Sequence, residues 1–272
     1  MRARDSQWPP HPQSAPHPNP SPAKRRGAQD RHPRMPSQPP IRHALLIHGA
    51  GAGGWEWNVW RDVLHARGVD TLAPDLQPSP QGIEATTLGD YRDQMRAALA
   101  ALPRPRAVVG ASLGGLLAWL CGDLADAMVL INPLRPQPWA WPAIPGADAA
   151  ARPAREWPDL IAWRRHARLA TTRAAMPDAD EAAILYAQRR WRDESGAVLR
   201  RALAGVEAPR PACPVLCIAS RGDEDVEPQL TARFAAAIGA NLIVGPGSHV
   251  GPLLGRDAAR TAAQAADWLS AR

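Results

Sequence analysis

The sequence predicts an α/β protein whose central sheet is parallel and has helices on both faces. Short apolar runs rich in Val, Ile and Leu alternate along the chain with longer segments of helical periodicity. Parallel strands need right-handed crossover connections, and the helices of those crossovers cover the sheet. A serine flanked by glycines lies between one such run and one such helix, and we expect the other elements to be arranged around it.

Four strands and three helices are expected in the first half of the chain. In chain order the strands are 41–47, 69–73, 107–110 and 127–131, and the helices are 57–67, 89–102 and 113–122. Gly68 follows the first helix in the place expected of a helix C-cap.

The alternation is interrupted between residues 133 and 211, a stretch rich in Pro, Arg, Ala and Trp. This stretch is far longer than the roughly 2–6 residues of a usual strand–helix connection. We therefore expect an inserted helical cap, with helices near 159–171 and 180–192. Strands at 215–219 and 241–244 and helices at 228–238 and 256–270 follow it, which completes a mainly parallel sheet of six strands.

Residues 1–40 are expected to be a disordered extension of the folded domain, 41–272. They hold eleven of the thirty prolines and few apolar side chains, so they cannot bury enough surface to fold. Residues 1–42 also carry the whole net charge of +6, so the basic character belongs to the tail. No nucleic-acid partner is therefore expected for the domain. A basic arm for anionic partners and a later translation start at Met35 are the alternative interpretations of the tail.

The cysteine content and the hydropathy indicate a reducing, cytoplasmic setting. Cys121, Cys213 and Cys217 are an odd number, give no disulfide framework and are expected to be buried. No cluster of ligands accompanies them, so no metal is expected. The chain has no apolar run of the roughly 18 residues that a membrane span needs, and no signal-peptide core at its start, so no membrane partner is expected.

The central serine lies in the sequence Gly110-Ala111-Ser112-Leu113-Gly114, between the strand 107–110 and the helix 113–122. In that context G-x-S-x-G predicts a nucleophile elbow, a tight turn that holds the serine in a strained conformation with Oγ exposed. Side chains at the two glycine positions would collide where strand and helix approach each other. An ordinary glycine-rich turn is the alternative.

A second glycine-rich loop, 48–54, follows the first strand and is expected at the same edge of the sheet as Ser112. We expect the backbone N–H groups of Ala50 and Leu113 to face an oxyanion formed above Ser112. A dinucleotide-binding loop is the alternative, but the spacing departs from G-x-G-x-x-G and the nearest acid, Asp75, lies beyond Pro74. The sequence therefore predicts an oxyanion loop.

Two further loops supply an acid and a base. Asp223, Glu224 and Asp225 follow the strand 215–219, and His249, the only histidine beyond residue 166, follows the last strand. The chain order serine, acid, histidine, each at a strand end, is that of a catalytic triad. Asp223 is the expected acid and Asp225 the alternative. The other position for an acid holds Asn132, which cannot serve.

These motifs resemble the α/β-hydrolase superfamily over about residues 41–272, and most of all its small-esterase branch with plant methylesterases and hydroxynitrile lyases. The resemblance also rests on His48-Gly49-Ala50-Gly51 with Trp55 and Trp57, on Ala73-Pro74-Asp75-Leu76 and on Val226. It implies a serine esterase for a small-molecule substrate, with no cofactor. In this mechanism the nucleophile Ser112 loses its proton to His249, which Asp223 orients. The lyases have a lysine beside the histidine, where this chain has Val250.

A small-ligand binding protein, or a thioesterase or lyase on the same fold, are the alternatives. Five tryptophans fall in the expected cap, namely Trp139, Trp141, Trp157, Trp163 and Trp191. They form either an apolar lid, which favours a small apolar substrate, or the core of the cap itself.

Deleting residues 1–34 is expected to leave the melting temperature and the rate with a model ester unchanged, because the tail lacks apolar side chains to pack. Thermal denaturation and an ester assay on both proteins check this. A fall of several degrees on truncation contradicts it.

Overall fold

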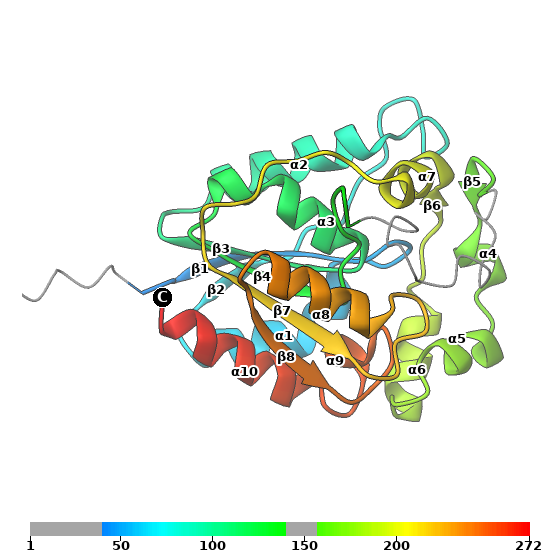
Figure 1. The fold of residues 1–272 in the computed structure, drawn as a ribbon. Helices are drawn as coiled ribbons and strands as arrows, with labels where there is room; N and C mark the ends of the chain where they lie inside the picture. Colours follow the sequence, from blue (N-terminus) through cyan, green and yellow to red (C-terminus); the bar gives the residue numbers. More distant parts are fainter. Residues whose placement is uncertain (1–39, 140–156) are drawn as a thin grey trace, which may run out of the picture. The chain divides into compact units, whose positions relative to one another are not determined.

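Six parallel strands form the central sheet in the order β2-β1-β3-β4-β7-β8, as the sequence predicts (Figure 1). The computed structural model describes residues 40–139 and 157–272, so most of the expected tail and part of the expected cap lie outside it. The strands are β1 His43–Ile47, β2 Asp70–Leu72, β3 Arg106–Ala111, β4 Ala127–Ile131, β7 Val215–Ser220 and β8 Asn241–Gly245.

The pairing register brings the strand ends to one edge of the sheet. Ile47, the last residue of β1, pairs with Gly110 of β3, and Ser220 of β7 pairs with Gly245 of β8. The strand order reverses between β1 and β3, because β1 connects onward to β2 on its other side. Loops that leave the sheet at such a switch point diverge and leave a crevice. The loop after β1 and the turn after β3 therefore lie on either side of that crevice.

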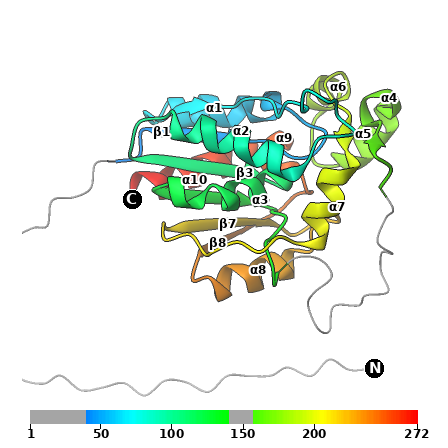
Figure 2. The same cartoon turned by 90° about the horizontal axis from the view of Figure 1, so that it is seen from above.

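Helices cover both faces of the sheet (Figures 1 and 2). The helices that pack on one face are α2 Leu88–Ala100, α3 Leu113–Leu120 and α8 Pro228–Ala237. Those that pack on the other face are α1 Asn58–His65, α9 Gly251–Leu254 and α10 Ala258–Ser270. The short 3₁₀ helices η1 Gly54–Trp57 and η2 Gly122–Leu124 flank α1 and α3. Gly68 follows α1 with φ +74°, the left-handed conformation expected of a C-cap glycine.

The described part of the cap region lies beyond the carboxyl ends of the strands (Figures 1 and 2). It contains β5 Leu160–Ile161, α4 Trp163–His166, α5 Leu169–Ala175, α6 Glu181–Gln188, β6 Glu194–Ser195 and α7 Gly196–Ala204. The helix expected at 159–171 is instead a strand and two short helices, and β5 pairs antiparallel with β6. Helix α7 was not expected; it begins where Ser195 Oγ accepts the N–H of Val198.

The cysteines differ in part from the expectation. Cys121 and Cys217 are buried, whereas Cys213 is only half-buried because it lies in the turn before β7, and all three are free thiols. Within residues 40–139 and 157–272, no helix is long and apolar enough to cross a membrane.

Strand β3 and helix α3 touch at the two glycines of the serine turn. A Cβ placed on Gly110 would overlap the carbonyl oxygen of Gly114, and a Cβ on Gly114 would overlap the carbonyl oxygen of Ile47. Both contacts are with backbone, which cannot move aside as a flexible side chain can. Glycine is therefore required at both positions for α3 to pack against β1 and β3.

The variant Gly110→Ala is expected to lose about 3 kcal/mol or more of stability, because overpacking against backbone is not relieved by a rotamer change. For a domain of this size that lowers the melting temperature by roughly 6–12 °C. Gly245→Ala is the matched control at another strand end, where a Cβ meets nothing within 4 Å. Equal melting temperatures for the two variants contradict the close approach.

Candidate active site

Ser112 occupies the turn between β3 and α3 in a strained backbone conformation, with φ 52° and ψ −119°. Three backbone hydrogen bonds hold it there. Its N–H donates to the carbonyl of Ile131 at 3.0 Å, and its own carbonyl accepts the N–H groups of Gly115 and Leu134, both at 2.9 Å. A non-glycine residue keeps a positive φ only where its surroundings impose it, and such residues gather at functional sites.

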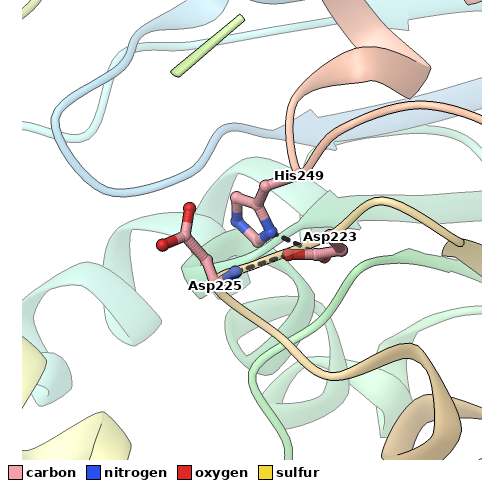
Figure 3. A group of neighbouring side chains, drawn as sticks. All are labelled: Asp223, Asp225 and His249. Atoms are coloured by element: carbon pink, nitrogen blue, oxygen red, sulfur yellow. Dashed lines mark hydrogen bonds and ion pairs between the residues drawn. The ribbon is translucent and has the colours of Figure 1, made fainter. Parts of the chain in front are cut away.

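The loops after β7 and β8 bring Asp223 and His249 into contact (Figure 3). Nδ1 of His249 lies 2.8 Å from Oδ2 of Asp223, whose side chain is fully buried. An ionised carboxylate only accepts hydrogen bonds, so the contact places the proton on Nδ1 and leaves Nε2 as the basic nitrogen. Ser112 Oγ makes no hydrogen bond with the residues the structure describes.

The second oxygen of Asp223, Oδ1, is held by the backbone of its own loop. It accepts the N–H groups of Asp225 and Val226 at 2.9 and 2.8 Å. Asp225 contributes its backbone to Asp223, as Figure 3 shows, and Asp223 faces the ring nitrogen. Ligand atoms of Asp223, Asp225 and His249 lie within 4.8 Å of one another, a spacing that a cation could bridge. Both oxygens of Asp223 already accept hydrogen bonds. This arrangement suits an acid that orients a histidine better than it suits a metal ligand.

The charges around His249 favour its protonated form. Burial lowers its pKa, but the hydrogen bond and charge of Asp223, followed by the charges of Asp225 and Glu56, outweigh burial and raise it above 6.5. A histidine whose basicity is raised by a partnered carboxylate suits general base catalysis.

The loop that carries His249 is fixed from two sides. Asn132, just after β4, donates from Nδ2 to the carbonyl oxygen of His249 at 2.7 Å. Asp178, between α5 and α6 of the cap, accepts the N–H of Ser248 at 3.1 Å and its hydroxyl at 2.6 Å. Asn132 is also the residue after Ile131, which binds the N–H of Ser112. The serine turn and the histidine loop are thus tied to adjacent residues.

Three carboxylates hold the backbone N–H groups of the loop after β1. Glu56 accepts the N–H of Gly49 at 3.2 Å, Glu194 that of Gly51 at 3.1 Å and Asp75 that of Gly54 at 2.7 Å. A phosphate in this loop would have to displace these acidic groups and face their negative charge. The loop is therefore unsuited to the dinucleotide that was the alternative interpretation.

His48 orients the peptide group between Gly49 and Ala50. Its Nε2 accepts the N–H of Leu76 at 2.9 Å, so Nδ1 carries the proton and donates to the carbonyl of Gly49 at 2.8 Å. Burial lowers the pKa of His48 to about 4, which keeps this tautomer neutral. In a planar trans peptide the N–H points opposite to the carbonyl, so the N–H of Ala50 points away from His48.

The N–H groups of Ala50 and Leu113 donate to no partner among the described residues. Leu113 is the first residue of α3, where helical N–H groups lack partners within the helix and the helix dipole favours negative charge. Gly49 lies next to Ser112, since a Cβ on Gly49 would be 3.4 Å from the Cβ of Ser112. The two N–H groups predicted to bind an oxyanion therefore belong to the residues that follow Gly49 and Ser112, and both are unpaired among the described residues.

The described cap tryptophans lie in different surroundings. Trp139 packs against Phe234 of the main core, and Trp191 packs edge-on against Trp55 in the cap core. Trp157 and Trp163 pack against each other, and a Cβ on Gly51 would overlap the ring of Trp163. Trp163 therefore lies on the loop after β1, and Trp141 lies outside the described residues.

A cavity of about 180 Å³ lies beside the loop after β1. It is bordered by His48 and Ala52 of the loop, Tyr91 of α2, and Arg164 and Arg192 of the cap region. Its walls combine charged groups with apolar side chains, among them Leu76 and Ile83, and none of the described cap tryptophans lines it. Neither Ser112 nor His249 lines it.

The sequence did not identify several polar residues that hold the loops of the site, among them Glu194. Glu56 had a weak signal, a single acid between two tryptophans at the start of a helix. Asn132 is excluded as an acid by its side chain, and the sequence gives no sign that it holds the carbonyl of His249. No sequence motif marks Asp178, because its hydrogen-bond partner Ser248 is 70 positions away along the chain.

A family profile described as "Alpha/beta hydrolase family" matches residues 44–264. The chain belongs to the alpha/beta hydrolase family. The motifs that predicted the fold and the geometry of the serine turn agree with this membership.

Two curated relatives match part of the chain. Norfluorocurarine synthase 2 from a Strychnos species is 37% identical over 97 residues, 34% of this chain and 36% of that protein. Salicylic acid-binding protein 2 from Nicotiana tabacum is 36% identical over 81 residues, 28% of this chain and 31% of that protein. The chain thus matches about a third of the length of these relatives.

Solved structures are similar over most of the chain. A pyrethroid hydrolase from Sphingobium faniae has a TM-score of 0.62 at 22% identity and covers 85% of this chain and 98% of its own. A methylesterase from Arabidopsis has a TM-score of 0.64 at 15% identity, with 84% and 99% covered. These matches confirm the predicted fold, and with the curated relatives they confirm the resemblance to the small-esterase branch.

Asp223→Asn is expected to lower the pKa of His249 because it removes both the charge-assisted hydrogen bond and the nearest negative charge. Asp225→Asn, the matched variant on the same loop, is expected to lower it less, since only a more distant charge is lost. NMR titration of the imidazole measures both. A larger shift in Asp225→Asn contradicts the geometry in Figure 3.

Proposed function

We propose that the protein is a serine hydrolase that cleaves a carboxylic ester of a small substrate. Ser112 is the nucleophile, His249 the general base and Asp223 the acid that orients it, while Ala50 and Leu113 supply the oxyanion donors. The contact between Asp223 Oδ2 and His249 Nδ1 carries the proposal, because it leaves Nε2 free to act as a base.

In the first half of the reaction, Ser112 Oγ attacks the ester carbonyl carbon and its proton passes to Nε2 of His249. The carbonyl oxygen becomes an oxyanion held by the N–H groups of Ala50 and Leu113. When the C–O bond breaks, the proton on Nε2 goes to the leaving alcohol. Water then attacks the acyl-enzyme by the same route, which releases the carboxylic acid and restores Ser112.

The similar proteins support this reaction class by name only. One is called a hydrolase of pyrethroids, one a methylesterase and one a binding protein for salicylic acid. The last name keeps ligand binding without turnover as the second candidate. A thioesterase uses the same groups, and we place it within the proposal. The free thiols are compatible with the cytoplasmic setting that completes the proposal.

A fluorophosphonate probe is expected to label Ser112, and Ser112→Ala is expected to abolish labelling. Turnover of p-nitrophenyl esters or acyl-CoA thioesters should fall by something on the order of 10⁶-fold, the scale for loss of a triad serine. His249→Ala should cost about as much and the double variant little more, because the groups act as a unit. Peptide mapping and steady-state kinetics measure these effects.

Asp223→Asn is expected to reduce kcat by roughly 10⁴-fold, as for a triad with the wrong histidine tautomer. Asp225→Asn is the control and should be mild. Label on another serine, or undiminished turnover in Ser112→Ala, overturns the hydrolase. Tight binding of esters without turnover by the wild type favours the ligand-binding alternative.

A further inference from the structure

Glu56 is a buried carboxyl group that the proposed mechanism does not use. It lies in η1 between two tryptophans, and only 3% of the residue is exposed. Its Oε1 accepts the N–H of Gly49 at 3.2 Å. A Cβ on Gly49 would lie 4.0 Å from that same oxygen and 3.4 Å from the Cβ of Ser112. Gly49 is therefore situated between the carboxyl group and the serine.

Gly49 is held at both of its backbone polar groups. Glu56 accepts its N–H, and His48 donates to its carbonyl oxygen at 2.8 Å. A glycine has the widest choice of backbone conformations, and the two side chains remove that freedom. The next peptide N–H is that of Ala50, the proposed oxyanion donor. The peptide between Gly49 and Ala50 is planar, so the bond to the carbonyl of Gly49 sets the direction of the N–H of Ala50. The bond from the N–H of Gly49 to Glu56 holds the preceding peptide and so limits rotation about Gly49.

The charge of Glu56 also reaches His249. A negative Glu56 raises the pKa of His249, and a positive His249 lowers that of Glu56. Burial nevertheless raises the pKa of Glu56 to about 7, so its negative charge develops around neutral pH. Asp223 and Asp225 also raise the pKa of His249, and His48 on the loop is neutral.

We propose that Glu56 is a positioning residue of the oxyanion hole, which directs the N–H of Ala50 toward Ser112 through Gly49 and acts on His249 through its charge. The inference rests on the proposed function, because it requires Ser112 to be the nucleophile. A purely structural carboxyl would affect folding stability but would not alter the ionisation of His249 or the reactivity of folded enzyme.

The test compares wild type, Glu56→Gln and Glu56→Met by the rate constant for fluorophosphonate labelling of Ser112 between pH 5 and 9. This readout needs no knowledge of the substrate, and it reports both the base and the oxyanion donors. Glu224→Gln, an exposed acid on the loop of Asp223, is the control for loss of a negative charge. Melting temperatures at each pH identify variants that are folded.

Glu56→Gln keeps an oxygen acceptor, so its labelling rate on the alkaline plateau should stay within about threefold of wild type, in keeping with an intact hydrogen bond. Glu56→Met removes the acceptor and leaves a buried N–H unpaired. It should label about 10- to 100-fold more slowly, less than the 10²–10³-fold cost of deleting an oxyanion donor outright. In both variants the acid limb should move to lower pH, because the charge that raises the pKa of His249 is gone. Glu224→Gln should match wild type.

A folded Glu56→Met that labels at the wild-type rate overturns the inference, as does an acid limb of Glu56→Gln that coincides with wild type. If Glu56→Met does not fold, the profile of Glu56→Gln alone decides. If wild type is labelled at Ser112 and the Glu56 variants have the wild-type labelling rate and pH profile, only the role of Glu56 is refuted. Wild type that does not label at Ser112 refutes the proposed function and this inference together.

Discussion

The proposed chemistry depends on the orientation of one peptide group, the one between Gly49 and Ala50. The loop around it is rich in glycine. Its conformation is fixed by hydrogen bonds from buried groups, with His48 on one side and Glu56 on the other. Such bonds are strong in a dry interior, so the donor is in place before a substrate binds.

The sheet and the serine turn could be predicted because their signals are local. Strand β3 is apolar after Arg106, and glycines mark its junction with α3. His249 was identified by its place after the last strand. Residues such as Asp178 were missed because their partners are distant in sequence, and nothing in the local pattern encodes such contacts. The same holds for α7, whose helical character is set by packing on the main core.

Two buried ionisable groups of the site, Glu56 and His249, make the stability of the fold depend on pH in the same direction. The pKa of Glu56 rises from 4.5 to about 7 on folding, which corresponds to roughly 3 kcal/mol of stability present below pH 4.5 and lost as the pH rises through 7. The raised pKa of His249 has the same sign, with stability present below pH 6.5 and lost above its folded pKa. The stability that the protonated forms of these two groups contribute is thus lost at the pH where His249 becomes a base.

The contacts of the cap with the site have a consequence for heat inactivation. Glu194 holds Gly51, Asp178 holds Ser248, and both acids belong to the region between β4 and β7. In the part of the cap that the structure describes, the cap core packs around four buried residues, whereas each face of the sheet buries many more. A small cluster of this kind opens at lower cost than the sheet. Opening it would release both loops while the six strands stay paired, so the enzyme would lose its reactive geometry in a local transition that precedes global melting.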